Sequence, residues 1–111
     1  MVINIKREGL NLIAELRGEL DHHSAQEVRN KIDDAIEREK SQNLIMSFEG
    51  VTFMDSSGIG VVIGRYKKLS MRGGKLVVTN INKTIGKVFE LSGLYKIIRV
   101  YTSIEEAIRS I

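Results

Sequence analysis

The fold is decided by residues 44–69, which have the sequence LIMSFEGVTFMDSSGIGVVIGRYKKL. The run Leu44–Phe48 is short and almost wholly apolar, which is typical of a strand buried inside a sheet. From Ile59 to Leu69 apolar residues return every three or four positions, which predicts an amphipathic helix that ends before Gly73-Gly74. A buried strand followed by such a helix is the repeating unit of an α/β sheet.

The same alternation continues in both directions from this stretch. Toward the N-terminus, period-two apolar residues, Leu10 included, flank a turn at Arg7-Glu8-Gly9 and indicate an opening hairpin. Ser24 and Glu27 then have the spacing of a capping box, and the following helix is expected to end near Lys40. Toward the C-terminus the patterns predict a strand at Leu76–Val78, and then a helix that has its apolar residues at Ile85, Val88 and Phe89 and ends at Gly93. A second strand follows with apolar residues Ile97, Ile98 and Val100. The last helix has its apolar positions at Ile104, Ala107, Ile108 and Ile111.

These elements predict an α/β fold with a mixed sheet of four to five strands, an opening hairpin and about four helices. The strands after the hairpin are expected to be parallel and joined by right-handed crossovers. A length of 111 residues suits one domain that spans residues 1–111. With 42% hydrophobic and 28% charged residues, the composition is that of an ordinary globular protein.

Composition also excludes several classes of function. The absence of cysteine rules out disulfides and thiolate metal sites, and fits a reducing compartment. No apolar run approaches the ~20 residues that cross a bilayer, so we expect a cytoplasmic protein with no membrane partner. The net charge is only +3 and aromatic residues make up 5%, which argues against direct nucleic-acid binding. The densest basic cluster is expected to be a solvated helix face and consists of Arg65, Lys67, Lys68 and Arg72.

The segment that carries chemistry is Asp55-Ser56-Ser57-Gly58, which follows a buried strand and opens a helix. In open α/β sheets the binding crevice lies beyond the carboxyl ends of the strands, and a helix start offers free N–H groups and a positive dipole end. The simplest interpretation is that Asp55, Ser56 or Ser57 caps the helix, because removing a cap costs ~1 kcal/mol. The same position also suits a site that receives an anion.

Sharper catalytic interpretations fit the sequence poorly. Gly58, Gly60 and Gly64 have GxGxxxG spacing rather than the GxGxxG of a dinucleotide site, and we expect Gly60 and Gly64 to allow close packing on the sheet. A serine hydrolase needs GxSxG and a later histidine, but His22-His23 precedes Ser56. Neighbouring histidines without HExxH spacing do not form a zinc site, so this pair is expected in a loop beside the helix cap.

Three stretches together resemble the bacterial anti-sigma factor antagonists, which are built on the STAS domain, and most closely the sporulation type. Gly18–Ala25 resembles their first loop, and Phe53–Gly60 with the following Gly64–Lys67 resembles their phosphorylation loop and helix. Leu91–Ile98 resembles their late helix-to-strand turn. The stretches occur in order, at compatible spacing, and together cover nearly the whole chain.

The resemblance implies a partner-switching protein rather than an enzyme. Such antagonists bind an anti-sigma factor that is also a serine kinase, and this binding releases a sporulation sigma factor. The kinase inactivates the antagonist by phosphorylating the serine that corresponds to Ser56, and a separate serine phosphatase restores it. The ATP belongs to the kinase, so the resemblance implies no cofactor for this chain.

Both polar loops follow strands, and the resemblance places them side by side in the partner-binding surface. The residues expected there are Asp21, His22, Ser24, Asp55, Ser57, Gly58 and Ile59. Two alternatives stay open. One is a STAS component of another switch, such as a general stress cascade. The other is a small phosphocarrier, which would hold an acid-labile phosphate on His22 or His23 in place of an acid-stable ester on Ser56.

Overall fold

The computed structural model describes all 111 residues, and it contains the five strands and four helices expected for the α/β class. No helix is long and apolar enough to cross a membrane. In chain order the elements are β1 (Val2–Glu8), β2 (Asn11–Leu20), α1 (Ala25–Glu39), β3 (Asn43–Met54), α2 (Ser56–Ser70), β4 (Leu76–Thr79), α3 (Lys83–Ser92), the short 3-10 helix η1 (Leu94–Lys96), β5 (Arg99–Tyr101) and α4 (Ile104–Ser110).

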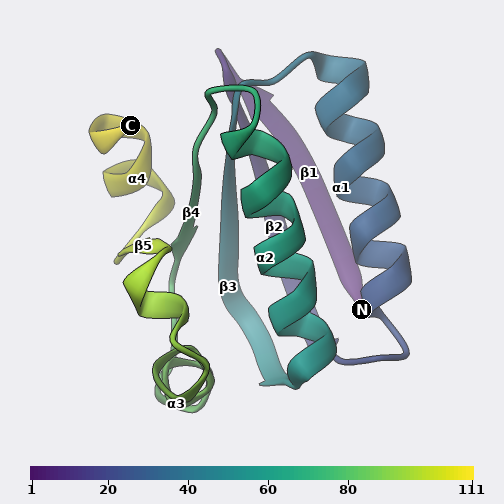
Figure 1. Cartoon of the computed structure of the whole chain (residues 1–111), viewed down its shortest axis with the longest axis vertical. Coiled ribbons are helices and arrows are strands. Elements are labelled where there is room, and N and C mark those ends of the chain that lie inside the picture. Colours follow the sequence, from purple (N-terminus) through teal and green to yellow (C-terminus); the bar gives the residue numbers. More distant parts are fainter.

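The strands form one sheet in the order β1-β2-β3-β4-β5 (Figure 1). β1 and β2 pair antiparallel as the expected hairpin, and Gly9 in the turn has a φ of +63°, which glycine adopts most easily. Every later neighbour pair is parallel, which confirms the mixed sheet. β2 to β5 all run toward the lower end of the molecule in Figure 1, where β2 and β3 end, whereas β4 and β5 are short and end higher up.

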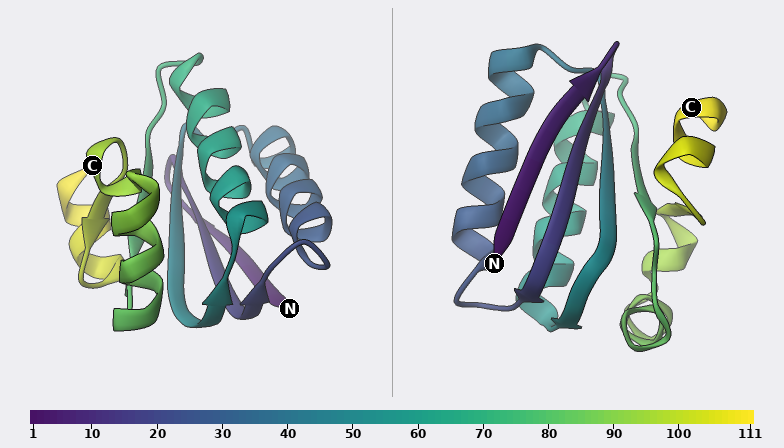
Figure 2. Two further views of the ribbon diagram at one scale, coloured as in Figure 1. Left: turned by 60° about the horizontal axis from the view of Figure 1, so that its bottom comes forward. Right: turned by 180° about the vertical axis from the view of Figure 1, so that it is seen from behind.

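Helices cover the two faces of the sheet unequally. α1, α2 and α3 pack on one face over the large core, where Leu12, Met46 and Phe48 are fully buried. α4 packs on the opposite face against a small cluster that contains Ile13 and Ile45. Neighbouring residues of one strand therefore enter different cores, as the period of two requires. Seen from behind in Figure 2, α4 leaves β1 and β2 uncovered.

Most helix features follow the predicted patterns. The buried face of α1 has the expected members, which are Ala25, Val28, Ile32, Ala35 and Ile36. α3 begins at an Asn82 cap, whose side chain accepts a hydrogen bond from the N–H of Ile85 at 2.8 Å. It ends at Gly93, whose φ of +79° gives the left-handed geometry common at helix ends.

Three boundaries differ from the sequence prediction. Leu10 lies in the hairpin turn and is exposed, so it does not belong to the alternating pattern. β3 continues past Phe48 to Met54, because its partner β2 is long enough to pair with the extension. β5 begins only at Arg99, since the chain first completes η1 after Gly93.

The prediction that the basic cluster forms a solvated face was wrong for Arg65. This side chain is buried, and its Nε lies 2.9 Å from Oδ1 of Asp33 on α1. Burial lowers the pKa of Arg65 and the charge of Asp33 opposes that shift, so the guanidinium stays charged at ordinary pH. The ion pair extends to the surface through Lys68, Glu37 and Arg72, and it joins α1 to α2.

Candidate functional site

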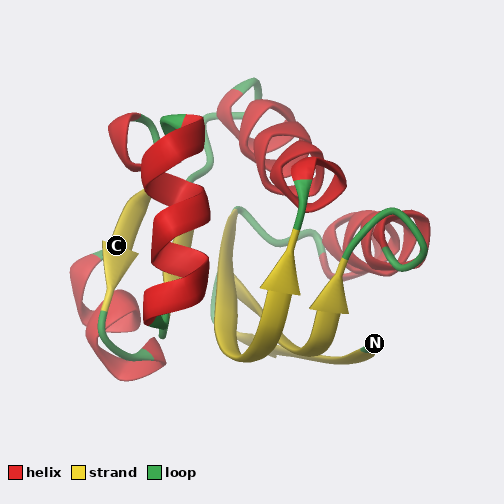
Figure 3. Cartoon of the chain, turned by 90° about the horizontal axis from the view of Figure 1, so that it is seen from below, coloured by secondary structure: helices red, strands yellow, loops and turns green.

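β2 and β3 end side by side, so the two polar loops meet at one end of the sheet. Leu20 pairs in register with Met54, and the backbone N–H of Asp55 donates to the carbonyl of Leu20 at 3.3 Å. Figure 3 shows the end of β3 leading directly into α2 and the end of β2 leading through a short loop into α1. The juxtaposition expected from the sequence is therefore present in the structure.

Asp55 caps α2, as the simplest interpretation of the segment predicts. Its carboxylate accepts a hydrogen bond from the backbone N–H of Ser57 at 2.9 Å. Ser56 is the first residue of the helix and is exposed, and the first turn carries no acidic residue. The Ser56 hydroxyl is therefore accessible and stands at the positive end of a 15-residue helix.

The loop before α1 is organised by Asp21 rather than by a capping box. Its carboxylate accepts hydrogen bonds from the backbone N–H groups of His23 at 2.9 Å and Ser24 at 3.1 Å. The Ser24 hydroxyl donates instead to the carbonyl of Glu19 at 2.7 Å. The predicted capping box was therefore wrong, since Ser24 makes no side-chain cap bond.

These bonds also set the acidity of Asp21. Partial desolvation raises the pKa of this carboxyl, but the hydrogen bonds from Ser24 and His23 and the nearby His23 charge outweigh it. The net result is a pKa below the ordinary value of 3.8. Both aspartates at the strand ends thus hold a turn by accepting backbone N–H groups.

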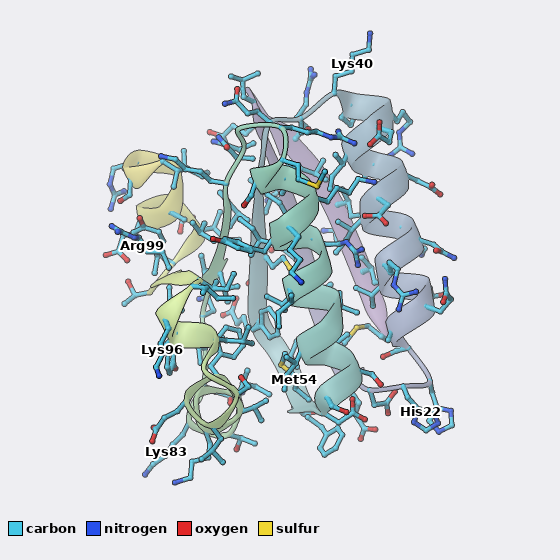
Figure 4. The ribbon with its side chains drawn as sticks, viewed as in Figure 1. His22, Lys40, Met54, Lys83, Lys96 and Arg99 are labelled. Carbon is cyan, nitrogen blue, oxygen red and sulfur yellow. The ribbon has the colours of Figure 1, made fainter.

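The histidine pair lies in the loop beside the helix start, as expected. His22 and His23 are exposed, with ring centroids 3.9 Å apart, and Figure 4 shows His22 at the tip of this end of the molecule. No three His, Asp or Glu side chains of the chain gather closely enough to hold a metal ion.

The glycine of α2 that packs closely is not the one expected from the sequence. Gly58 was expected in the partner-binding surface but is buried, and a Cβ there would lie 2.8 Å from the Leu20 carbonyl oxygen and from Cγ of Met54. Gly60 and Gly64 were expected to pack closely on the sheet, yet a Cβ at either position would meet nothing within 4 Å. The close approach therefore occurs at Gly58, between the two loops.

The other expected residues reach the surface. His22 is exposed, and the partly exposed ones are Asp21, Ser24, Asp55, Ser57 and Ile59. Sequence reasoning missed Phe53, an aromatic side chain that is 47% exposed at the end of β3. Its signal was present, since Phe53 falls within the segment that resembles the phosphorylation loop, but strand alternation does not indicate whether it faces solvent.

Comparison with known proteins identifies the family. Residues 2–107 match the STAS domain. The chain is 42% identical over 90 residues to the anti-sigma F factor antagonist of Paenibacillus polymyxa, a match that covers 81% of this chain and 77% of that protein. The chain belongs to the STAS-domain anti-sigma factor antagonists. Members of this family are regulators rather than enzymes.

Solved structures of an antagonist show the same fold in two chemical forms. The unphosphorylated form of the Bacillus anti-sigma factor antagonist SpoIIAA is 36% identical, with a TM-score of 0.84 and coverage of 99% of this chain and 98% of that one. Its phosphorylated form gives a TM-score of 0.76 at the same identity, with 97% of each chain covered. The STAS antagonist fold thus occurs with and without a phosphate.

Proposed function

We propose that this STAS protein is an anti-sigma F factor antagonist whose residues 1–111 act as one domain in the cytoplasm. Its unphosphorylated form binds an anti-sigma factor that is also a serine kinase, which releases the sporulation sigma factor. The kinase inactivates the antagonist at Ser56, and a serine phosphatase reactivates it. The observation that carries this proposal is the exposed Ser56 at the start of α2, beside the Asp21 loop.

The docking surface is the area formed by the two loops and the end of β3. It consists of Asp21, His22, Ser24, Phe53, Asp55, Ser57 and Ile59 around Ser56. The two Asp turns hold the loop backbones in place, so little conformational entropy is lost on binding. Phe53 supplies an exposed aromatic side chain of the kind that anchors protein interfaces.

Phosphorylation switches binding through charge. A phosphoserine carries about −1.5 to −2 charges at neutral pH, and the N-terminal end of a helix favours such a group. In the complex this charge would be buried beside the Asp55 carboxylate. An unpaired buried charge costs ~3–5 kcal/mol, which corresponds to a loss of affinity of roughly 10² to 10³-fold or more.

The deciding experiment mixes the protein with its anti-sigma kinase and ATP, followed by intact-mass measurement and size-exclusion chromatography. Wild type should gain one acid-stable phosphate and leave the complex, and Ser56→Ala should gain none and stay bound. Ser57→Ala is the matched control, because it removes the neighbouring hydroxyl and should behave as wild type. A phosphate on Ser56→Ala, or an acid-labile phosphate on His22 or His23, would contradict the proposal.

A further inference from the structure

The net charge of the protein is concentrated in one segment. Residues 80–101 contain one acidic residue, Glu90, and four basic residues, so they carry the whole net charge of +3, and the other 13 basic and 13 acidic residues cancel. The four basic residues are Lys83, Lys87, Lys96 and Arg99. None of them takes part in an ion pair, since every ion pair of the chain joins residues between Lys6 and Arg72.

This segment also forms a cleft of about 630 Å³ between α3 and the β5 end. Lys83 and Lys87 line it from α3, one helical turn apart, and Tyr95 and Tyr101 line it from η1 and β5. The cleft lies beyond the carboxyl ends of β4 and β5, the position where open α/β sheets bind ligands. Its residues are different from those of the docking surface.

The wall of the cleft is held in place before any ligand arrives. Tyr95 is 46% exposed, and its ring packs on Phe89 with centroids 5.6 Å apart. Its hydroxyl lies over Gly86, where a Cβ would come within 3.0 Å of it. The start of α3 is fixed to β3 because the Asn82 side chain donates to the carbonyl of Val51 at 3.0 Å.

We propose that this basic cleft, lined by Lys83, Lys87, Tyr95 and Tyr101, binds an acidic segment of a partner protein. Glu90 also lines the cleft, but the two lysines outnumber it and neither is ion-paired, so they supply net positive charge for carboxylates. The tyrosine rings supply a surface for an apolar side chain. Figure 4 shows Lys83, Lys96 and Arg99 along one side of the molecule, opposite His22, so the positive field continues past the cleft. The concave, partly apolar lining fits a peptide better than a flat membrane surface or a phosphate backbone.

The test uses the full chain labelled with ¹⁵N and a synthetic peptide of alternating Glu and Leu, titrated by NMR. Amide shifts should be confined to residues 80–101, and binding should weaken as salt is raised, because exposed charges are screened. Lys83→Glu/Lys87→Glu should reduce affinity at least about tenfold, since it places like charges opposite the peptide. Both lysines are exposed, so this variant should melt like wild type.

Two controls distinguish specific binding in the cleft from non-specific attraction to a positively charged protein. Lys31→Glu/Lys67→Glu changes the net charge equally on the exposed faces of α1 and α2, and it should bind the peptide as wild type does. A peptide with Gln in place of Glu should not bind. The proposal is overturned if the acidic peptide changes no amide chemical shifts, or if it changes those of residues around Asp21 and Ser56 instead. It is also overturned if the peptide binds both charge variants with equal affinity. Binding of anionic phosphatidylglycerol vesicles or duplex DNA at residues 80–101 without peptide binding would overturn it as well.

Discussion

Gly58 and Gly60 lie two residues apart on α2, but their surroundings are opposite. A methyl group at Gly58 would press on the carbonyl that holds the two loops together, so Gly58→Ala should lower the free energy of unfolding by about 1–3 kcal/mol. A methyl group at Gly60 would point into open space, so Gly60→Ala should raise it by about 0.5–1 kcal/mol. Urea denaturation measures both changes. Equal effects of the two substitutions would show that the contact with Leu20 is not what constrains Gly58.

Asp21 should link the stability of its loop to pH. Because its folded pKa is lowered, the stabilisation is fully present above the ordinary value of 3.8 and is lost as pH falls through the lower folded pKa. Asp21→Asn should therefore melt below wild type at pH 7, and the gap should close on acidification. Melting curves between about pH 7 and pH 2 test this, with Glu27→Gln as the control carboxyl of the same region. A gap that stays constant down to the lowest pH would rule out this linkage.

The structural roles of some site residues could be predicted from the sequence, and those of others could not. Asp55 and Ser56 were predictable, because a polar pair between a buried strand and a helical pattern has few other positions. The roles of Gly58 and Ser24 were not, because they depend on the carbonyls of Leu20 and Glu19. No local pattern indicates which carbonyl will lie against a given side chain.

At the scale of elements, periodicity predicted which residues of a helix are buried but not which neighbouring element they contact. The face of α1 was correct because every member contacts the sheet core. Arg65 was misassigned because its partner, Asp33, lies on a different helix. A charged residue inside an apolar face is buried only when such a partner exists, and a single sequence does not indicate the pairing.

The Arg65–Asp33 pair should hold α1 and α2 in a fixed relation, and with them the two loops that they follow. Asp33→Asn leaves the buried guanidinium without its counter-charge and should cost about 1–3 kcal/mol of unfolding free energy, less than for a fully buried pair because Asp33 is partly exposed. Arg65→Met should recover most of that loss in the double variant. Chemical denaturation of the three variants provides the measurement. A double variant no more stable than Asp33→Asn would argue against an uncompensated charge as the cause.

For the whole molecule, the parallel sheet directs both proposed surfaces toward the same end of the domain. The carboxyl ends of β2 and β3 lead into the docking surface, and those of β4 and β5 lead into the basic cleft. This arrangement follows from topology, because parallel neighbours run in the same direction, although β4 ends beside Ser47 and β3 continues to Met54. A partner could therefore approach one end of the domain while the helical layers stay unchanged.

Phosphorylation of Ser56 should accordingly change binding and net charge but leave the fold intact. The phosphate shifts the net charge from +3 to about +1. Its attraction to the start of α2 and its repulsion from Asp55 oppose each other, so the net effect on stability should stay within about 1 kcal/mol, or roughly 5 °C in Tm. Calorimetry of the phosphorylated protein, before and after phosphatase treatment of the same sample, measures this shift. A fall in Tm of more than about 10 °C would mean that the phosphate acts by loosening the domain, because an effect that large exceeds any helix-end interaction.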